Sequence, residues 1–166
     1  MKSLLKSTVG LGAITSLFCL GLPSAPVLAN SFNACARDLI ASGISGEAAG
    51  SACGSALVPR DLSLCVSRVN RPGAIAPEEA LQACYQVRRP RDLASCFNSI
   101  ERRVDLSSTT PNQVLDNCRK SLLPERYSEC VLGLTNQGES IAAEQALNDC
   151  LSTENYPTAL FPTTDN

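Results

Sequence analysis

Residues 84–96 read Cys84-YQVRR-Pro90-RDLAS-Cys96, and the pattern occurs twice more without gaps: Cys53-GSALV-Pro59-RDLSL-Cys65 and Cys118-RKSLL-Pro124-ERYSE-Cys130. In each copy the proline stands midway between the two cysteines. Proline is well tolerated at the first position of a helix, where its missing N–H is not needed. An acidic residue follows each proline within two positions, where the helix dipole favours negative charge. A helix is therefore predicted to begin at each proline.

The cysteines extend this pattern over most of the chain. After position 30 they are Cys35, Cys53, Cys65, Cys84, Cys96, Cys118, Cys130 and Cys150. Every second step is short and constant in length, from 53 to 65, from 84 to 96 and from 118 to 130, whereas the steps between them are longer and vary. The resulting period of roughly 30 to 34 residues indicates one small supersecondary unit repeated in tandem.

The segments that begin at the prolines carry an apolar stripe that includes the second cysteine of each pattern. In one copy the stripe is formed by Leu93, Cys96, Phe97 and Ile100, at positions i, i+3, i+4 and i+7. This spacing is typical of an amphipathic helix with a buried cysteine. The segment around Cys35 has the same spacing. Four helices of this first type are predicted, at roughly 31–42, 59–70, 90–103 and 124–136.

A second type of helix is predicted in the longer cysteine steps. Ser45 and Thr110 are good N-cap residues, Pro77 and Pro111 suit a first helical position, and Gly43 suits a left-handed cap before such a helix. These helices are expected at roughly 45–57, 76–88, 110–122 and 140–153. The predicted fold is all-α, with four tandem αα-hairpins (eight short helices), disulfide-stapled, in a solenoid-like or compact helical array. The repeat domain would span 30–154, followed by a flexible C-terminal tail at 155–166.

Two sets of disulfides are compatible with the repeat. Pairing across the short steps would leave Cys35 and Cys150 without partners at opposite ends of the array. Pairing across the longer steps leaves no cysteine unpaired after position 30. It gives the pairs Cys35–Cys53, Cys65–Cys84, Cys96–Cys118 and Cys130–Cys150. The second set is preferred. Each of its bonds would close a loop of roughly 20 residues, a length at which cross-linking restricts the unfolded chain appreciably.

Residues 1–29 are expected to form a signal peptide that is removed. Lys2 and Lys6 form a positive start, an uncharged stretch covers 8–22, and a small residue, Ala29, suits cleavage after it. This stretch is shorter than the roughly 20 residues that a membrane span needs, although an uncleaved anchor is the alternative. The leader resembles that of an exported bacterial protein, which predicts a periplasmic or extracellular location. No later segment is long and apolar enough to span a bilayer.

Removal of the leader would leave 30–166, enough for one domain. It would take away two of the 14 basic residues and none of the 16 acidic ones, so that the net charge becomes −4. This balance argues against nucleic acid as a partner, because binding to phosphates requires a basic surface. The remaining cysteines form an even set in an oxidising compartment, as a disulfide framework requires.

The chain lacks the usual residues of catalysis. It contains no histidine, no tryptophan and no C-x-x-C motif, which excludes Ser-His-Asp and Cys-His arrangements and argues against a thioredoxin-like redox site. Zinc sites built from four cysteines normally use closely spaced pairs, whereas no two cysteines here are closer in sequence than Cys53 and Cys65. The prediction is a protein that is not an enzyme, with no catalytic residue, no metal and no cofactor.

Arginine provides the candidate binding residues, since every basic residue after the leader except Lys120 is an arginine. Two groups are candidates for a surface that binds an anionic partner. Arg88, Arg89 and Arg91 cluster at one turn, while Arg68, Arg71, Arg102 and Arg103 lie at the ends of two helices expected to be neighbours. Arginine suits bidentate recognition of carboxylates and similar groups. The alternative is that these residues complement the helix dipoles and keep the protein soluble.

The predicted function is that of a binding or interaction module whose partner is another protein or an acidic surface ligand, because repeat arrays expose an extended surface. The alternative is a carrier of a small apolar ligand, with room left by the small residues of 48–56. The period is close to that of tetratricopeptide repeats, but their signature Trp, Gly and Tyr positions are absent, and no family is recognised. Neither the oligomeric state nor the identity of the partner follows from the sequence.

Overall fold

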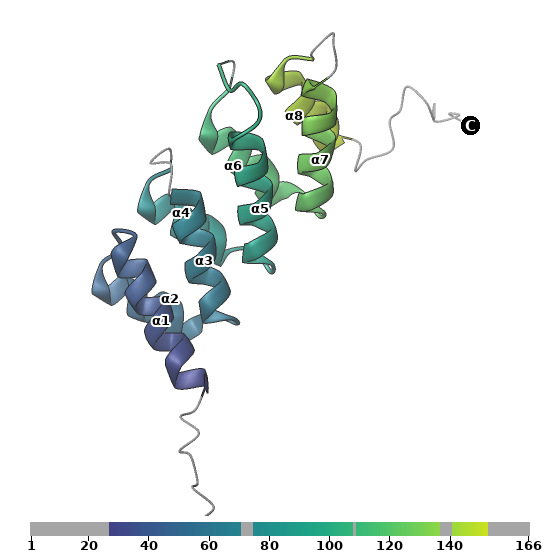
Figure 1. The fold of residues 1–166 in the computed structure, drawn as a ribbon. Coiled ribbons are helices and arrows are strands. Elements are labelled where there is room, and N and C mark those ends of the chain that lie inside the picture. Colours follow the sequence, from purple (N-terminus) through teal and green to yellow (C-terminus); the bar gives the residue numbers. More distant parts are fainter. Residues whose placement is uncertain (1–26, 71–74, 108, 137–140, 153–166) are drawn as a thin grey trace, which may run out of the picture.

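The structure of the protein, a computed structural model, describes residues 27–70, 75–107, 109–136 and 141–152 (Figure 1). Eight helices form in these ranges and are of two alternating types. The A helices are α1 (Val27–Ala41), α3 (Pro59–Asn70), α5 (Pro90–Glu101) and α7 (Pro124–Thr135). The B helices are α2 (Gly46–Ser55), α4 (Pro77–Tyr85), α6 (Pro111–Lys120) and α8 (Ala143–Ser152). The predicted all-α fold of four hairpins is confirmed.

The helix boundaries follow the signals in the sequence closely. The helices α3, α5 and α7 begin at the prolines predicted to start them. Thr110 caps α6 by accepting a hydrogen bond from the backbone N–H of Gln113, and Ser45 caps α2 in the same way through Ala48. Gly43 has a φ of 97°, the left-handed conformation expected of it. The local chemistry of caps and prolines therefore accounts for most helix starts.

Some predicted boundaries are wrong by a few residues. The sequence predicts B helices that reach 57, 88 and 122, but α2, α4 and α6 end two or three residues earlier, at Ser55, Tyr85 and Lys120. The residue before a proline is driven out of the helical conformation, and Arg89 before Pro90 has φ −126° and ψ 79°. The proline that starts each of these A helices thus prevents the preceding B helix from continuing into it.

At the N-terminus α1 begins at Val27, so the predicted cleavage position after Ala29 falls in its first turn. Most of the predicted leader (1–26) and the predicted tail (155–166) lie outside the described residues.

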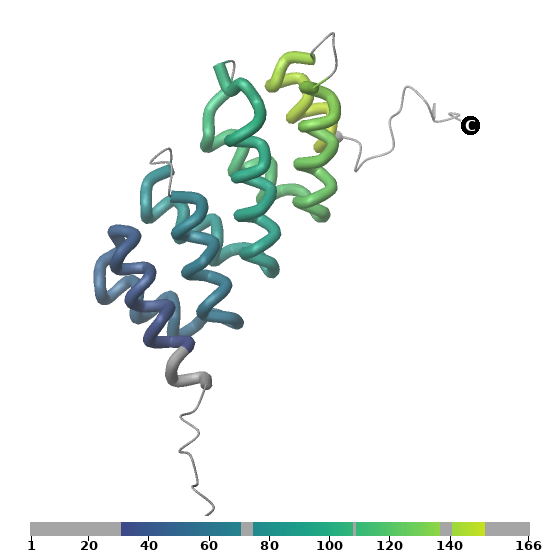
Figure 2. The backbone as a smooth tube through the Cα atoms, viewed as in Figure 1, coloured from purple at the N-terminus to yellow at the C-terminus, as the bar shows by residue number. Residues whose placement is uncertain are grey.

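The hairpins are stacked in sequence order. Each A helix packs against the next A helix and against the B helix of its own hairpin. Neighbouring B helices contact one another much less. The four A helices consequently form a row that runs through the molecule, with α1 at one end and α7 at the other (Figure 2). No helix in the described part of the chain is long and apolar enough to cross a membrane.

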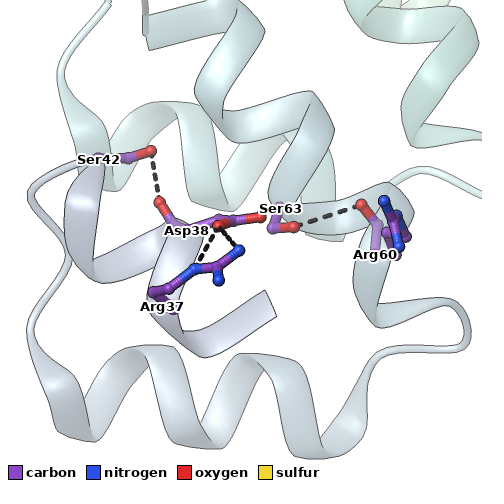
Figure 3. Close-up of polar contacts among 5 residues, drawn as sticks. All are labelled: Arg37, Asp38, Ser42, Arg60 and Ser63. Carbon is purple, nitrogen blue, oxygen red and sulfur yellow. Dashed lines mark hydrogen bonds and ion pairs between the residues drawn. The ribbon is translucent and has the colours of Figure 1, made fainter. Parts of the chain in front are cut away.

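Small buried side chains allow the A helices to approach one another. Two positions before the A-helix cysteine stand Ser63, Ala94 and Ser128, all buried. The equivalent residue of α1 is Asn33, which is exposed, because no described hairpin precedes α1. The Ser63 hydroxyl donates to the backbone carbonyl of Arg60 at 3.3 Å, so its burial leaves no unpaired donor (Figure 3).

Figure 3 also shows two polar contacts of α1. The guanidinium of Arg37 pairs with the carboxylate of Asp38 at 3.0 Å, and the Ser42 hydroxyl donates to the backbone carbonyl of Asp38 at 2.9 Å. These contacts join residues close in sequence, so they support the helix and its C-terminal end and do not link hairpins.

Four disulfides link the A and B helices. They join Cys35–Cys53, Cys65–Cys84, Cys96–Cys118 and Cys130–Cys150, with Cα–Cα distances of 5.9–6.0 Å. These are the pairs across the longer steps, so the preferred pairing is confirmed. Each disulfide stays within one hairpin, and each closes a loop of a length expected to contribute roughly 3 kcal/mol.

Because no disulfide joins one described hairpin to the next, the hairpins are held together by packing and by polar contacts. The Asn70 amide at the end of α3 donates to the backbone carbonyl of Ser42 at 2.9 Å. The hydroxyl groups of Tyr85 and Ser55 are 3.0 Å apart, and Arg91 pairs with Asp61 at 2.6 Å. The buried faces of the A helices supply the apolar part of this contact, with Phe97 as the largest fully buried side chain.

Candidate interaction surfaces

The cysteines of the described residues offer no free thiol. All those that lie in the described residues form disulfides, and most are fully buried in the core. In the same part of the chain no three or more His, Cys, Asp or Glu side chains converge so as to hold a metal ion.

One candidate surface is formed by the turns that lead from each B helix into the next A helix. The two residues before each proline are Leu57 and Val58, then Arg88 and Arg89, then Leu122 and Leu123. All three turns precede A helices that stack side by side, so they lie along the same side of the array, which we call the proline-turn edge (Figure 2). Its four apolar side chains are 92% (Leu57), 52% (Val58), 78% (Leu122) and 49% (Leu123) exposed.

Two grooves connect these turns. The first has a volume of about 390 Å³ and lies between the first and second turns, where its lining includes Leu57, Val58, Tyr85 and Arg88. The second has a volume of about 280 Å³ and lies between the second and third turns, where its lining includes Leu123 and the acidic residues Glu125 and Glu129. Arg89 lines both grooves. The edge is therefore one continuous surface, with apolar side chains at its two outer turns, arginines at the middle turn, and acidic side chains in both grooves.

The arginines of this edge differ in how far they are already paired. Arg89 pairs with Asp92 at 3.1 Å within α5 and its cap, and Arg91 pairs with Asp61 of the preceding hairpin at 2.6 Å. Arg88 is exposed and makes no ion pair with any described residue. Of the three arginines predicted at this turn, Arg88 is the one that remains available to an anionic group.

Three of the remaining predicted arginines lie at the opposite ends of the A helices. Arg68, Arg102 and Arg103 line one groove of about 380 Å³ between α3 and α5, the juxtaposition that stacking of the hairpins predicts. Arg71 lies outside the described residues. The predicted arginines that lie in the described residues thus belong to two separate surfaces, one at each end of the A helices.

The small residues of 48–56 do not surround an enclosed space. Gly50 and Gly54 are exposed, and nothing lies within 4 Å of the position that a Cβ would take at either of them. Ala48 is exposed as well, while Ala49 and Cys53 provide the buried side of α2. At these two glycines the exposed face of α2 therefore carries no side chain.

Tyr127 has a shifted pKa, and its role is structural. The Tyr127 hydroxyl donates to the backbone carbonyl of Leu147 at 3.0 Å and so joins α7 to α8. Burial raises the pKa of Tyr127 to about 12, against a smaller lowering by the neighbouring Asn117 side chain. The phenol is therefore neutral at physiological pH, and its role is to hold the last hairpin together.

Comparison with protein-family models, with curated proteins and with solved structures finds no match for this chain. The class of protein is thus defined by the fold alone, as a disulfide-linked array of helical hairpins. The exposed leucines are the surface residues that sequence reasoning missed. The sequence does contain a signal for them. In two of the three aligned patterns an apolar pair stands where the other pattern has Arg88 and Arg89.

Proposed function

We propose that this chain is an exported binding module, without catalytic activity, that recognises another protein through the proline-turn edge. The observation that carries the proposal is the exposure of Leu57 and Leu122 at equivalent positions of two repeats. Exposed apolar residues that gather beside grooves are typical of interaction sites. Burial of one leucine side chain in an interface is worth about 1.5–3 kcal/mol.

The fold itself does not require apolar residues at these positions. Arg89 and Leu123 occupy equivalent places and have nearly the same backbone, with φ and ψ of −126° and 79° against −128° and 74°. A charged residue therefore serves this turn as well as an apolar one. The leucines are best explained by a contact outside the described fold.

The charge of the edge indicates the chemistry of the partner. Arg88 stands between two apolar turns and has no acidic partner among the described residues. A complementary partner would present apolar side chains on both sides of a carboxylate. Such a segment would place its carboxylate in the first groove, which Arg88 lines, and an uncharged stretch along the second groove, where acidic side chains would repel a further carboxylate. The partner is accordingly proposed to be a protein and not a nucleic acid.

Export to the periplasm or the extracellular space forms part of this proposal. It is supported by the leader-like residues 1–29 and by four disulfides, which persist in oxidising compartments. A protein stabilised in this way can present its surface where reducing enzymes are absent.

The test compares Leu57→Ser and Leu122→Ser with Ile40→Ser as a matched control. Ile40 is 52% exposed near the C-terminal end of α1, away from the proline-turn edge. Purified variants, shown by circular dichroism to be folded, are used to capture proteins from the exported fraction of the source cells. A protein retained by the unmodified chain and by Ile40→Ser should lose affinity about tenfold or more with either leucine variant.

Retention of no protein by the unmodified chain would contradict the proposal, as would equal retention by all variants. The mass of the purified chain in solution is measured alongside. A dimer that Leu57→Ser dissociates would identify the partner as a second copy of this chain.

A further inference from the structure

We propose a second and separate site, in which Arg68, Arg102 and Arg103 bind a phosphate or sulfate group in the groove between α3 and α5. This site lies at the C-terminal ends of these helices, whereas the proline-turn edge lies at their N-terminal ends. It goes beyond the proposed binding of a protein, because it specifies a different ligand and uses different residues.

The groove is built by two neighbouring hairpins. Arg68 comes from the last turn of α3, while the other lining residues come from α5 and its C-terminal end: Ala94, Ser95, Asn98, Ser99, Arg102 and Arg103. Ser95, Ser99 and Arg102 are spaced i, i+4 and i+7, so they lie along one face of α5. The site therefore exists only where the two hairpins are stacked.

No acidic side chain of the described residues lines this groove. Four other arginines, Arg37, Arg89, Arg91 and Arg119, pair with a described aspartate. By contrast, Arg68, Arg102 and Arg103 make no ion pair within the described ranges. Glu101 is adjacent to Arg102 in sequence, but it does not line the groove. Three like charges thus share one concave surface without compensation from the side chains around them.

Complementation of the helix dipoles accounts for only part of this charge. The C-terminal end of a helix carries about half a negative charge, so the ends of α3 and α5 together offset about one of the three positive charges. An excess of about two remains in the groove. A phosphate or sulfate dianion would balance it.

The donors present suit a tetrahedral oxyanion. A guanidinium donates two parallel hydrogen bonds to such a group, and the hydroxyls of Ser95 and Ser99 add neutral donors. The Asn98 amide uses one of its two N–H groups to donate to the backbone carbonyl of Ala94 at 2.8 Å. The volume of about 380 Å³ is in the range of small-molecule sites. The groove therefore accommodates either a free anion or one attached to a larger molecule such as a sulfated glycan.

The test measures binding of inorganic phosphate, inorganic sulfate and a sulfated oligosaccharide by calorimetry at constant ionic strength, with chloride as the reference anion. Arg68→Gln and Arg102→Gln are compared with Arg60→Gln, which removes the same charge from the exposed N-terminal turn of α3. Loss of one arginine from the groove should weaken binding about tenfold, whereas Arg60→Gln should change it less than about twofold.

Tighter binding of the oligosaccharide than of the free anions would identify a glycan as the source of the sulfate. Failure of the unmodified chain to bind any of the three would overturn the proposal. An equal loss of affinity in Arg60→Gln would also overturn the proposal, because it would show that the anion is attracted by the overall charge of the protein and not by the groove. Leu57→Ser should bind the oxyanion as the unmodified chain does. A failure of the oxyanion proposal can therefore be distinguished from a failure of the proposed protein binding at the proline-turn edge.

Discussion

Replacing Cys96 and Cys118 together by alanine is expected to lower the free energy of unfolding by about 2–5 kcal/mol. This disulfide ties α5 to α6 in an interior hairpin, which packs against neighbours on both sides. In a repeat array, stability is approximately the sum of the repeat stabilities and the contacts between neighbours. Loss of an interior hairpin therefore also removes the contacts made by the hairpins beside it.

The control is the same double replacement of Cys35 and Cys53, in the first hairpin. The two loops differ little in length, with separations of 22 and 18 residues, so the direct entropic effect should be similar. The first hairpin has a described neighbour on one side only, and it can unfold locally while the others stay folded. Denaturant unfolding followed by circular dichroism should show the larger loss for the interior pair. Equal losses would contradict cooperative stacking.

Phe97→Ala is expected to cost about 3–5 kcal/mol of stability. Phe97 is fully buried in α5, within the row of A helices that no described disulfide crosses. Its removal leaves a cavity where the contact between hairpins depends largely on packing. The matched control is Phe32→Ala, because Phe32 is 40% exposed on α1, and we expect a loss below about 1 kcal/mol there. Thermal unfolding of the two variants measures the difference, and similar losses would refute this role for Phe97.

The stability of the array thus has two sources that act at different levels. Disulfides hold each hairpin together, which matters because short helices are marginal alone owing to the cost of nucleation. Packing of the A helices joins the hairpins, and it depends on small residues such as Ser63 and Ala94. This division leaves the surface free to vary from repeat to repeat, as the three proline turns do.

The fold was largely predictable because the relevant signals are local. Prolines, caps and an apolar stripe of helical period each act within one helix, and the regular cysteine spacing orders the helices along the chain. The ends of the B helices were predicted less well, since the extent to which Pro59 and Pro124 unwind the preceding residues depends on the turn geometry. The predicted ranges therefore include Leu57 and Leu122 as the last residues of helices, and their exposure was missed.

The surfaces were only partly predictable, because they depend on how neighbouring hairpins meet. The stacking of two A helices can be inferred from the repeat, and it brings Arg68 and Arg102 to one groove. The pairing of Arg91 with Asp61 crosses from one hairpin to the next. No spacing rule within one helix reveals such a contact, and it removes Arg91 from the set of available cations.

Our central claim is that the cysteines serve structure alone and that the surface carries the function. Intact mass of the purified protein before and after reduction, followed by peptide mapping without reduction, tests it most directly. We predict a chain beginning at Asn30, a mass increase of about 8 Da for four bonds, and the pairs Cys35–Cys53, Cys65–Cys84, Cys96–Cys118 and Cys130–Cys150. Free thiols, a retained metal ion or a different pairing would contradict the claim and would make the cysteines the place to seek activity.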